Sequence, residues 1–358
     1  MSYHNRLMTL LEITRQLTAE TDLDRLLKLI VSRTTQLLDA DRTTLYLLDQ
    51  ETGELYSKIA EGTMTIRLPM GHGLAGHVAQ TGQVLNIQDV QHDPRHASRF
   101  EQLTGYQVNT MLAAPMRDRA GRIIGVVQVL NKQVGKFTSE DEALLIALAS
   151  SAAIALENAR LHTQVQRMLD SLIATLAAMI DARDREMAGH SQRLTDYAVA
   201  IASRMGLPAK RVELIRVAGL LHDVGKIGVP EAILTKAGEL TPKEMSIMRD
   251  HTRLTREILA KVNLSDDLRD VPYIAAHHHE RLDGSGYPDG LRGEEIPLES
   301  RILAVVDVFD ALTSRRYYHE PVSDREALAE LERGAGVLFD AEVIKILKQL
   351  IAERESAP

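Results

Sequence analysis

The chain has 358 residues, of which 44% are hydrophobic and 26% charged, and its formal net charge is −8 at pH 7. This composition is typical of a soluble globular protein, and the negative charge argues against electrostatic binding of a nucleic-acid polymer. The absence of cysteine excludes disulfides, iron–sulfur clusters, thiolate zinc sites and cysteine-linked chromophores. At about 150 residues per domain, the length predicts two domains.

The N-terminal sequence MSYHNRLMTLLEITRQL lacks an apolar run long enough for a signal sequence. No stretch of the chain approaches about 18 consecutive apolar residues. The lack of cysteine is also compatible with a reducing compartment. We therefore expect a cytoplasmic protein without a membrane partner.

The front part of the chain predicts a mixed α+β domain. Residues 3 to 38 show the helical 3.6-residue period, interrupted at Thr21 and Asp22, which offer a helix cap. After Arg42 the segments RTTLYLLD and LYSKIAEG, joined by the turn-rich DQETGE, predict a hairpin. Further strands are expected at TIRLPM, QVLNIQD, TMLAAPMRD and GRIIGVVQVLN, with a short helix at GLAGHVAQTG. We expect this domain to end near Lys136.

A long helix is predicted next, because residues 137 to 188 contain neither glycine nor proline. Its apolar residues keep a seven-residue register that favours a parallel pair of helices from two copies of the chain. The alternative is a long helix that packs on its own domain. The predicted seam consists of Leu145, Leu148, Ala152, Ala155, Ala159, Leu169, Ile173, Leu176 and Ile180.

The remainder of the chain predicts an all-helical domain. Helices are expected at LTDYAVAIASRM, AKRVELIRVAGLLHDVG and TPKEMSIMRDHTRLTREILAKV, and two more after Pro297. No strand signal of comparable strength occurs there.

Histidine and acidic residues in the helical part have spacings that suit metal binding. Glu186 and His190 are four residues apart, so on one helix they would share a face. His222 and Asp223 are adjacent at the end of an apolar helix and could both reach one ion close to that helix. Taken alone, such a pair is more often a satisfied core or capping pair.

Four further residues favour the metal interpretation: His251, His278, His279 and Asp307. Asp307 lies in the apolar run RILAVVDVFDAL, where a charged carboxylate is costly unless an ion or a partner compensates it. Nitrogen and carboxylate ligands without sulfur suit iron, manganese, zinc or nickel, and two adjacent ions are suited to displacement at phosphorus. Lys226, four residues after His222, could offset transition-state charge.

The motifs HDVGKIGVP, HHHERLDGSGYPDGLRGEEIP and RILAVVDVFDALTS together resemble the HD-GYP subgroup of the HD phosphohydrolase superfamily. The resemblance covers residues 165 to 350 and implies a bacterial phosphodiesterase that cleaves cyclic di-GMP to pGpG and often further to GMP. It also implies two or three divalent metal ions, iron or manganese, on an all-helical fold. The metal ligands that it implies are His190, His222, Asp223, His251, His278, His279 and Asp307, with Lys226 and Asp223 as catalytic residues.

Glu186 corresponds to a family position at which a glutamate accompanies a third metal ion, and the alternative is a solvated glutamate in the run DARDREM. His277 precedes the paired histidines of the family motif, so we expect it on the helix surface or behind the ligands.

The resemblance implies a substrate loop containing Gly284, Gly286 and Tyr287. Its alternative is a plain turn between helices.

Two departures from the family pattern concern the ligand and the substrate. His251 is followed by Thr252 where proline is usual, and SRRYYHE replaces a DRPYR-like segment. Arg316 still falls at the position of a phosphate-contacting arginine, whereas His319 stands where a second basic residue is usual. The altered segment permits another substrate, such as cyclic GMP-AMP.

The front domain resembles a GAF domain, a small-molecule sensor module. Asn131, Lys132, Phe137, Asp141 and Glu142 follow the NKFDE pattern of GAF domains in cyclic-nucleotide phosphodiesterases and cyclases. In that family the pattern is largely an internal brace in which the lysine and the aspartate pair. The resemblance implies a small ligand, such as a cyclic nucleotide.

We thus expect an α+β GAF domain joined by a long helix to an all-α HD-GYP domain. The expected boundaries are 1–20 for an N-terminal helix, 21–160 for the GAF domain, 138–185 for the connecting helix and 165–358 for the HD-GYP domain. A homodimer through the connecting helix would let the GAF ligand regulate hydrolysis. An alternative of another class is a slow or inactive site that reports cyclic di-GMP to partners, including diguanylate cyclases.

Overall fold

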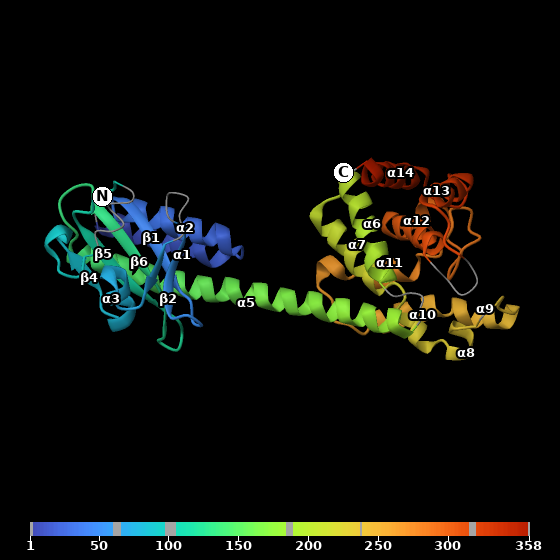
Figure 1. Ribbon diagram of the computed structural model, residues 1–358, viewed down its shortest axis with the longest axis horizontal. Coiled ribbons are helices and arrows are strands. Elements are labelled where there is room, and N and C mark those ends of the chain that lie inside the picture. Colours follow the sequence, from blue (N-terminus) through green and yellow to red (C-terminus); the bar gives the residue numbers. More distant parts are fainter. Residues whose placement is uncertain are drawn as a thin grey trace. The chain divides into compact units, whose positions relative to one another are not determined.

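The structure is a computed structural model that describes residues 3–59, 66–96, 105–183, 189–236, 238–314 and 320–356. It divides into two compact units, residues 1–167 and 168–358. Helix α5 (Ser139–Arg183) begins in the first unit and ends in the second (Figure 1). The expected α+β fold of the front part and the expected helical fold of the back part are both confirmed.

The first unit is built on a six-stranded sheet with the order β3-β2-β1-β6-β5-β4. Every neighbouring pair of strands is antiparallel, and β1 and β2 form the predicted hairpin. The other predicted strands are present as well. The strands are β1 (Ala40–Leu48), β2 (Glu54–Ile59), β3 (Arg67–Pro69), β4 (Leu85–Ile87), β5 (Met111–Arg117) and β6 (Ile123–Lys132).

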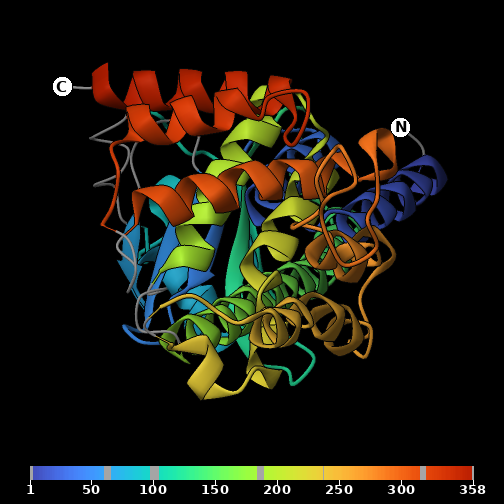
Figure 2. The same cartoon turned by 90° about the vertical axis from the view of Figure 1, so that its right-hand side faces the viewer.

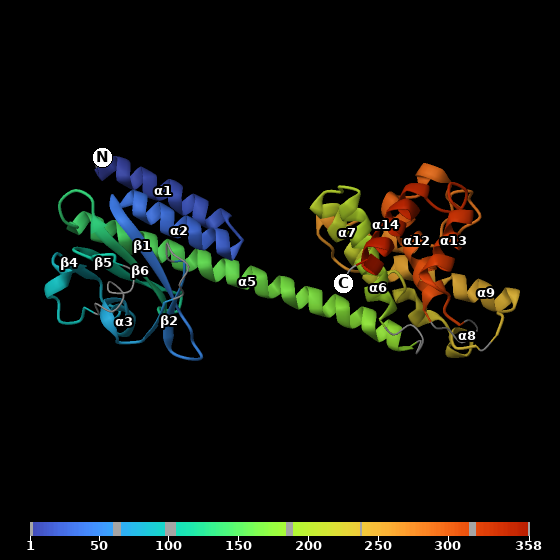
Figure 3. The same cartoon turned by 45° about the horizontal axis from the view of Figure 1, so that its top comes forward.

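Helices cover both faces of this sheet. Successive side chains of a strand point to opposite faces, and Leu45 and Tyr46 of β1 accordingly belong to two different apolar clusters. The cluster around Leu45 includes residues of α1, α2 and the start of α5, whereas the cluster around Tyr46 includes residues of α3. Figure 3 shows α1 and α2 side by side. These helices are α1 (Tyr3–Ala19), α2 (Leu23–Leu37) and α3 (Gly73–Thr81), and a short 3₁₀ helix, η1, spans Val90–His92.

The lysine and the aspartate of the NKFDE-like pattern are in contact. Lys132 Nζ lies 3.1 Å from Asp141 Oδ1 and donates a hydrogen bond of 2.7 Å to the carbonyl of Leu38. Arg6 of α1 pairs with the same carboxylate, and the backbone N–H of Thr138 donates to its other oxygen at 2.9 Å. Asp141 is therefore a buried acceptor that connects α1, β6 and the start of α5.

The other residues of the pattern support neighbouring segments. Asn131 has a φ of 54°, and its side-chain oxygen accepts the backbone N–H of Asn109 at 2.7 Å. Phe137 is buried in the core beneath α1 and α2. Glu142 accepts a hydrogen bond of 2.7 Å from the Asn86 amide. The residues of the pattern thus make internal contacts of the first unit.

Replacing Asp141 by asparagine should lower the unfolding free energy of the first unit by about 3 kcal/mol, because Lys132 loses the anion that compensates its burial. Burial would raise the pKa of Asp141, but the hydrogen bonds from Arg6, Thr138 and Lys132 hold it below its ordinary value. This stabilisation is complete above the unfolded pKa of about 3.9 and is lost as pH falls through the lower folded pKa.

Urea unfolding at pH 7 and below pH 4 measures this effect, with hydrogen exchange of β5 and β6 peptides reporting on the unit. The difference between Asp141→Asn and the wild type should shrink at the lower pH. Glu12→Gln, which alters an exposed ion pair of α1 with Arg15, is the matched control and should change little. Equal stability of Asp141→Asn and the wild type at pH 7 would contradict the assigned role.

The predicted dimer seam on the long helix is wrong over its first half. An amphipathic pattern does not reveal whether the chain's own sheet or another helix covers it. The alternative of a helix packed on its own domain describes this part, because the core of the first unit contains Leu145, Leu148, Ala152, Ala155 and Ala159. Further along, Ile173 packs on the core of the second unit and Ile180 is half-buried, whereas Leu169 and Leu176 are exposed.

A different set of apolar side chains on α5 is exposed to solvent. Consecutive members of this set are three, four or seven residues apart, so they lie along one face of the helix. They are Leu161, Val165, Met168, Leu172 and Met179.

Among the described residues, α5 is the one helix that is long and apolar enough to cross a membrane by length and composition. Half of its apolar window is buried inside the structure, and a core helix of a soluble protein passes the same test. The finding is therefore weak evidence for a membrane span. The sequence-based expectation missed the window because it considered only uninterrupted apolar runs.

The second unit contains helices packed around one apolar core. Helix α6 lies against α7, α12 and α14, and α11 lies against α7 and α10. Figure 2 shows α12, α13 and α14 beside one another. The helices are α6 (His190–Arg204), α7 (Ala209–Leu221), α8 (Glu231–Leu234), α9 (Pro242–Arg249), α10 (His251–Leu259), α11 (Val271–Ala276), α12 (Leu298–Thr313), α13 (Asp324–Arg333) and α14 (Ala341–Ser356). Short 3₁₀ helices are η2 (Val224–Gly228), η3 (Asp266–Leu268) and η4 (Gly293–Glu295).

Two helix predictions for this unit were wrong in detail. The segment predicted as one helix from Thr241 consists of α9 and α10, which are separated at Asp250 although neither glycine nor proline marks the break. In the part of the chain that the structure describes, three helices follow Pro297 instead of two. The capping box of Ser323 and Glu326, which begins α13, was a visible sequence signal for the additional helix.

Candidate metal centre

His222 and Asp223 stand at the point where α7 ends and η2 begins. His222 Nδ1 lies 2.7 Å from the carbonyl of Gly219, and a carbonyl can only accept, so Nδ1 carries the proton. The other ring nitrogen, Nε2, has no hydrogen-bond partner and lies 3.2 Å from Asp223 Oδ2. A cation between this nitrogen and the carboxylate would give both buried atoms a partner. The pair therefore has the chemistry of a metal site.

His251 at the start of α10 and His278 in the turn after α11 repeat the same arrangement. His251 opens α10 and its Nδ1 lies 2.7 Å from the Met248 carbonyl, while Nδ1 of His278 lies 2.6 Å from the Ala275 carbonyl. Their Nε2 atoms approach Asp223 Oδ1 at 3.3 Å and 4.0 Å. A hydrogen bond from the second nitrogen fixes the orientation of a ligating histidine. Both imidazoles are thus oriented toward the Asp223 carboxylate.

His190 begins α6 and joins the cluster from the other side. Its Nδ1 lies 2.6 Å from Asp310 Oδ2, and its Nε2 lies 3.4 Å from Asp307 Oδ1. Arg193 donates to both oxygens of Asp310 at 2.8 Å and 3.0 Å, which neutralises that buried carboxylate. His279 Nδ1 lies 3.7 Å from Asp307 Oδ2. Asp307 is therefore shared by two histidines.

Among the described residues, three groups have ligand atoms that all lie within 4.8 Å of one another. The group that contains Asp223 shares His222 with one of the other two groups and His278 with the other, so the groups are continuous and can hold more than one ion. Buried atoms of the cluster also have no hydrogen-bond partner: Nε2 of His190, His222, His251 and His278, and Oδ1 of Asp223. The groups are His251, His278 and His279; His190, His222 and Asp307; and His222, Asp223 and His278.

The charge states of the cluster favour ligation. Burial would raise the pKa of Asp223, but Lys226 and His222 hold that pKa well below its usual range. Burial would likewise raise the pKa of Asp307, but His190 and His279 hold it well below its usual range. Burial lowers the pKa of His278 strongly and that of His279 to about 3. The carboxylates are therefore charged and these imidazoles neutral, as metal ligands must be.

His190 differs from the other histidines. Burial would lower its pKa, but the carboxylates of Asp307 and Asp310 raise it to about 9. Without an ion His190 carries a proton at neutral pH, so ligation by its Nε2 would release that proton.

Two predicted site residues, Glu186 and Arg316, lie outside the residues that the structure describes. The expectation that Glu186 and His190 share one helix face therefore stays a prediction, and the described part of α6 begins at His190. Gly189, just before it, has a φ of 72°, a left-handed conformation that favours glycine and ends the helical pattern.

His277 is fully buried and does not lie on a helix surface. Its Nδ1 lies 2.6 Å from the Tyr273 carbonyl, and its Nε2 lies 2.9 Å from Asp289 Oδ2 in the glycine-rich loop. The first histidine of HHH therefore contacts the loop, while the second and third join the cluster.

The loop after the histidines packs on its own chain. Gly284 has a φ of 80°, and a Cβ atom at Gly286 would lie 2.4 Å from the Cα of Glu280. At Gly286 the close approach is therefore to the backbone that adjoins the paired histidines. Tyr287 is half-buried, with its ring 4.8 Å from the ring of His279. The loop is thus held beside the cluster.

Glu280 was given no role by sequence reasoning, yet it anchors this loop. Its buried carboxylate accepts three backbone N–H groups: those of Asp289 at 2.8 Å and Gly290 at 3.0 Å on Oε1, and that of Leu291 at 3.1 Å on Oε2. Asp310 and Arg193 were missed in the same way. Each stands three residues after a predicted ligand, Asp307 or His190, and this helical spacing was the available signal.

Glu280→Gln should destabilise the second unit by about 1–3 kcal/mol, because an NH₂ group replaces one acceptor oxygen and leaves a buried N–H unpaired. Thermal unfolding measures the loss. Glu295→Gln, at the capping box of η4, is the control on the same loop and should have a smaller effect. Unfolding of Glu280→Gln at the wild-type temperature would show that the three hydrogen bonds do not hold the loop.

Comparisons with known proteins give the same division of the chain. Residues 22–156 match the family model of the GAF domain, and residues 174–343 match that of the HD domain. The chain is 37% identical over 224 residues to the 3'3'-cGAMP-specific phosphodiesterase 2 of Vibrio cholerae, which covers 61% of this chain and 42% of that protein.

Two other relatives are named for cyclic di-GMP. The cyclic di-GMP phosphodiesterase response regulator RpfG of Xanthomonas campestris is 41% identical over 192 residues, 54% of this chain and 50% of that protein. The cyclic di-GMP phosphodiesterase of Thermotoga maritima is 41% identical over 191 residues, 53% of this chain and 52% of that protein. The chain spans about half the length of the curated relatives that it matches. It carries a GAF domain followed by an HD domain.

Proposed function

We propose that the chain is a metal-dependent phosphodiesterase that hydrolyses cyclic dinucleotides. The observation that carries this proposal is the convergence on Asp223 of buried histidine Nε2 atoms that lack hydrogen-bond partners. Nitrogen and carboxylate ligands suit iron and manganese, and adjacent divalent ions are typical of enzymes that act at phosphorus. The ligands that we propose are His190, His222, Asp223, His251, His278, His279 and Asp307.

Divalent ions, when bound, supply Lewis acidity to the phosphoryl group and a nucleophile at neutral pH. The chain's own contribution centres on Lys226, whose Nζ lies 2.6 Å from Asp223 Oδ2 and is half-buried. In that position a fixed positive charge can offset the negative charge that develops on the phosphoryl oxygens. Asp223 therefore acts as both a ligand and the partner that orients Lys226.

Tyr287, Gly284 and Gly286 form the substrate side of the proposal. The ring of Tyr287 lies against His279, and the guanidinium of Arg249 lies 5.0 Å from the centre of that ring. An aromatic ring and an arginine so close to the ligands suit stacking with a nucleobase. Beyond the described residues, we retain Glu186 as a ligand of a third ion and Arg316 as a phosphate contact.

Cyclic di-GMP is the first candidate substrate, with pGpG as product and GMP as the product of further hydrolysis. Two of the relatives are named cyclic di-GMP phosphodiesterases. The second candidate is 3'3'-cGAMP, favoured by the name of another relative. The alternative of a different class is a site that binds the dinucleotide without turnover and signals to partners such as diguanylate cyclases.

For the first unit we propose a sensor role with a small ligand, such as a cyclic nucleotide. A cytoplasmic homodimer that pairs through α5 would use the exposed Leu161, Val165, Met168, Leu172 and Met179, because the first half of the original seam is buried within one chain. The domain boundaries 21–160 and 165–358 are part of this proposal.

Product analysis tests the proposed activity. Protein purified anaerobically with manganese or iron is incubated with cyclic di-GMP and with 3'3'-cGAMP, and the linear dinucleotides and mononucleotides are separated. We expect a linear dinucleotide from at least one substrate. Binding of either cyclic dinucleotide without any product would contradict the enzymatic proposal and favour the signalling alternative.

A further inference from the structure

Arg183, the last residue of α5, contacts the segment that carries Lys226. Its guanidinium donates hydrogen bonds to the carbonyls of Lys226 at 2.7 Å, Ile227 at 2.6 Å and Val229 at 2.9 Å. These carbonyls lie at the end of η2, where the last acceptors of a helix lack helical partners, although that of Lys226 also accepts the backbone N–H of Val229 at 3.1 Å. One planar cation therefore satisfies three backbone groups of a five-residue helix and the residue after it.

The opposite side of η2 is held by α10. Thr255 accepts the backbone N–H of Gly225 at 3.0 Å and donates to the His222 carbonyl at 3.0 Å. A Cβ atom at Gly225 would lie 1.9 Å from the His251 carbonyl oxygen, so η2 packs directly against α10. Leu254 of α10 also packs against the end of η2 at Gly228, and Arg183 adds the hydrogen bonds to the carbonyls there.

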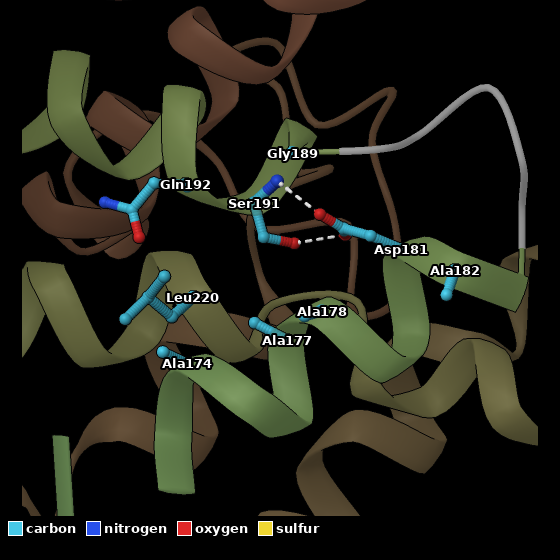
Figure 4. Close-up of a pocket in the computed structure, with 9 residues that line it drawn as sticks. All are labelled: Ala174, Ala177, Ala178, Asp181, Ala182, Gly189, Ser191, Gln192 and Leu220. Atoms are coloured by element: carbon cyan, nitrogen blue, oxygen red, sulfur yellow. Dashed lines mark hydrogen bonds between the residues drawn. The ribbon is translucent and has the colours of Figure 1, made fainter. Parts of the chain in front are cut away.

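A second side chain of the same helical turn holds the start of α6. Asp181 is buried and accepts the Ser191 hydroxyl at 2.7 Å and the Ser191 backbone N–H at 3.3 Å (Figure 4). Gly189, the N-cap of α6, has no side chain to cap that helix, so Asp181 supplies the acceptor from α5. Ser191 follows His190 directly, so this contact adjoins the ligand cluster.

A cavity lies beside the last turns of α5, where Asp181 and Arg183 make their hydrogen bonds. Ala174, Ala177 and Ala178 of α5 line a cavity of about 340 Å³ that also borders Asp181, Ser191 and Leu220 (Figure 4). Ala177 belongs to the core of the second unit, but small side chains beside a cavity make few dispersion contacts, so polar contacts add to the positioning of this part of α5. The hydrogen bonds of Asp181 and Arg183 then set where α5 ends relative to α6 and η2.

We infer that Arg183 is a positioning residue for Lys226: it fixes the turn from which Lys226 reaches Asp223, and it makes the position of that turn depend on the end of α5. This inference rests on the proposed phosphodiesterase function. Lys226 would act by placing one positive charge near the phosphoryl oxygens. A displacement of this charge by about 1 Å can lower the rate about 10²-fold. The proposal assigns Arg183 no contact with substrate or metal.

The first test measures the turn itself and does not depend on activity. Hydrogen exchange of a peptide covering residues 224–229 is compared in the wild type, Arg183→Ala, Arg183→Lys and Arg204→Ala. Arg204 is an exposed arginine of α6 that pairs with Glu353, which makes it a matched control. We expect faster exchange in both Arg183 variants, with α12 peptides and metal content unchanged. Wild-type exchange of residues 224–229 in Arg183→Ala would overturn the inference.

The second test asks whether Arg183 acts through Lys226. In metal-loaded protein, Arg183→Ala should lower kcat about 10²-fold, and millimolar guanidinium should restore part of the loss. The double variant Arg183→Ala, Lys226→Ala should be no slower than Lys226→Ala alone. Once the Lys226 side chain is removed, Arg183 has no lysine left to position, so its loss has no further effect on kcat. Additive losses would overturn the inference. If Arg183→Ala does not fold, Arg183→Lys, which keeps the charge but not the planar fork, serves in both tests.

The two proposals fail in distinguishable ways. A wild-type protein that forms no product from any cyclic dinucleotide contradicts the proposed function, whereas the exchange comparison still decides whether Arg183 positions the Lys226 turn.

Discussion

Asp223→Asn should lower turnover of the cyclic dinucleotide by more than about 10²-fold, because loss of outer-shell support alone can cause losses of that size at a metal site. Asp223 approaches His222, His251 and His278 and pairs with Lys226, so the substitution removes a charged ligand and the lysine's partner together. Bound manganese or iron, measured by elemental analysis, should fall in parallel with turnover.

The matched control is Asp267→Asn, which removes an exposed carboxylate of η3 that pairs with Lys210. It should retain wild-type turnover and metal content, and circular dichroism should show the same helix content in both variants. An Asp223→Asn protein with wild-type metal content and turnover would remove Asp223 from the proposed ligand set.

Lys226→Ala should lower kcat by about 10²–10³-fold while the metal content stays near that of the wild type. The side chain supplies a positive charge but no ligand atom, so its loss affects the transition state more than the assembly of the centre. Steady-state kinetics with elemental analysis on the same samples separates the two effects.

Lys210→Ala, at an exposed lysine of α7, provides the comparison for a lost surface charge and should behave as the wild type. If Lys226→Ala loses its metal together with its activity, Lys226 supports the centre and has no separate role in turnover. An unchanged kcat would exclude both roles.

The sequence indicated the ligand cluster because its motifs combine into one specific pattern. The His222–Asp223 pair, His251 and Asp307 lie far apart in the chain, and spacing alone could not place them together. The resemblance to the HD-GYP subgroup supplied that step, and the structure brings seven of the eight proposed ligand residues into continuous groups. The eighth, Glu186, lies outside the described residues.

The supporting residues were less visible in the sequence. Glu280, Asp310 and Arg183 act through hydrogen bonds to backbone groups or to ligands from other elements, and such contacts depend on tertiary packing. A glutamate after paired histidines or an arginine at a helix end has many ordinary explanations. Only the three N–H groups around Glu280 and the three carbonyls around Arg183 distinguish these side chains from solvated ones.

The fold of the first unit followed closely from hydrophobic periodicity and turn residues, since the predicted strands and helices are all present. The long helix was also predicted, but the partner of its first half, its own domain, was given only as the alternative. Leu145 and Leu148 pack into the sheet of their own unit, and a heptad pattern would look the same if they packed against a second copy. Periodicity identifies the covered face of a helix and leaves the covering element open.

Metal reconstitution tests the central claim most directly. Protein stripped of metal is titrated anaerobically with manganese or iron, and linear dinucleotide formation from cyclic di-GMP and 3'3'-cGAMP is followed in the wild type and in a His222→Ala, Asp223→Ala double variant. We predict that turnover appears with added metal, saturates at more than one ion per chain and is absent from the double variant. Turnover in the double variant at the wild-type rate would contradict the assigned centre.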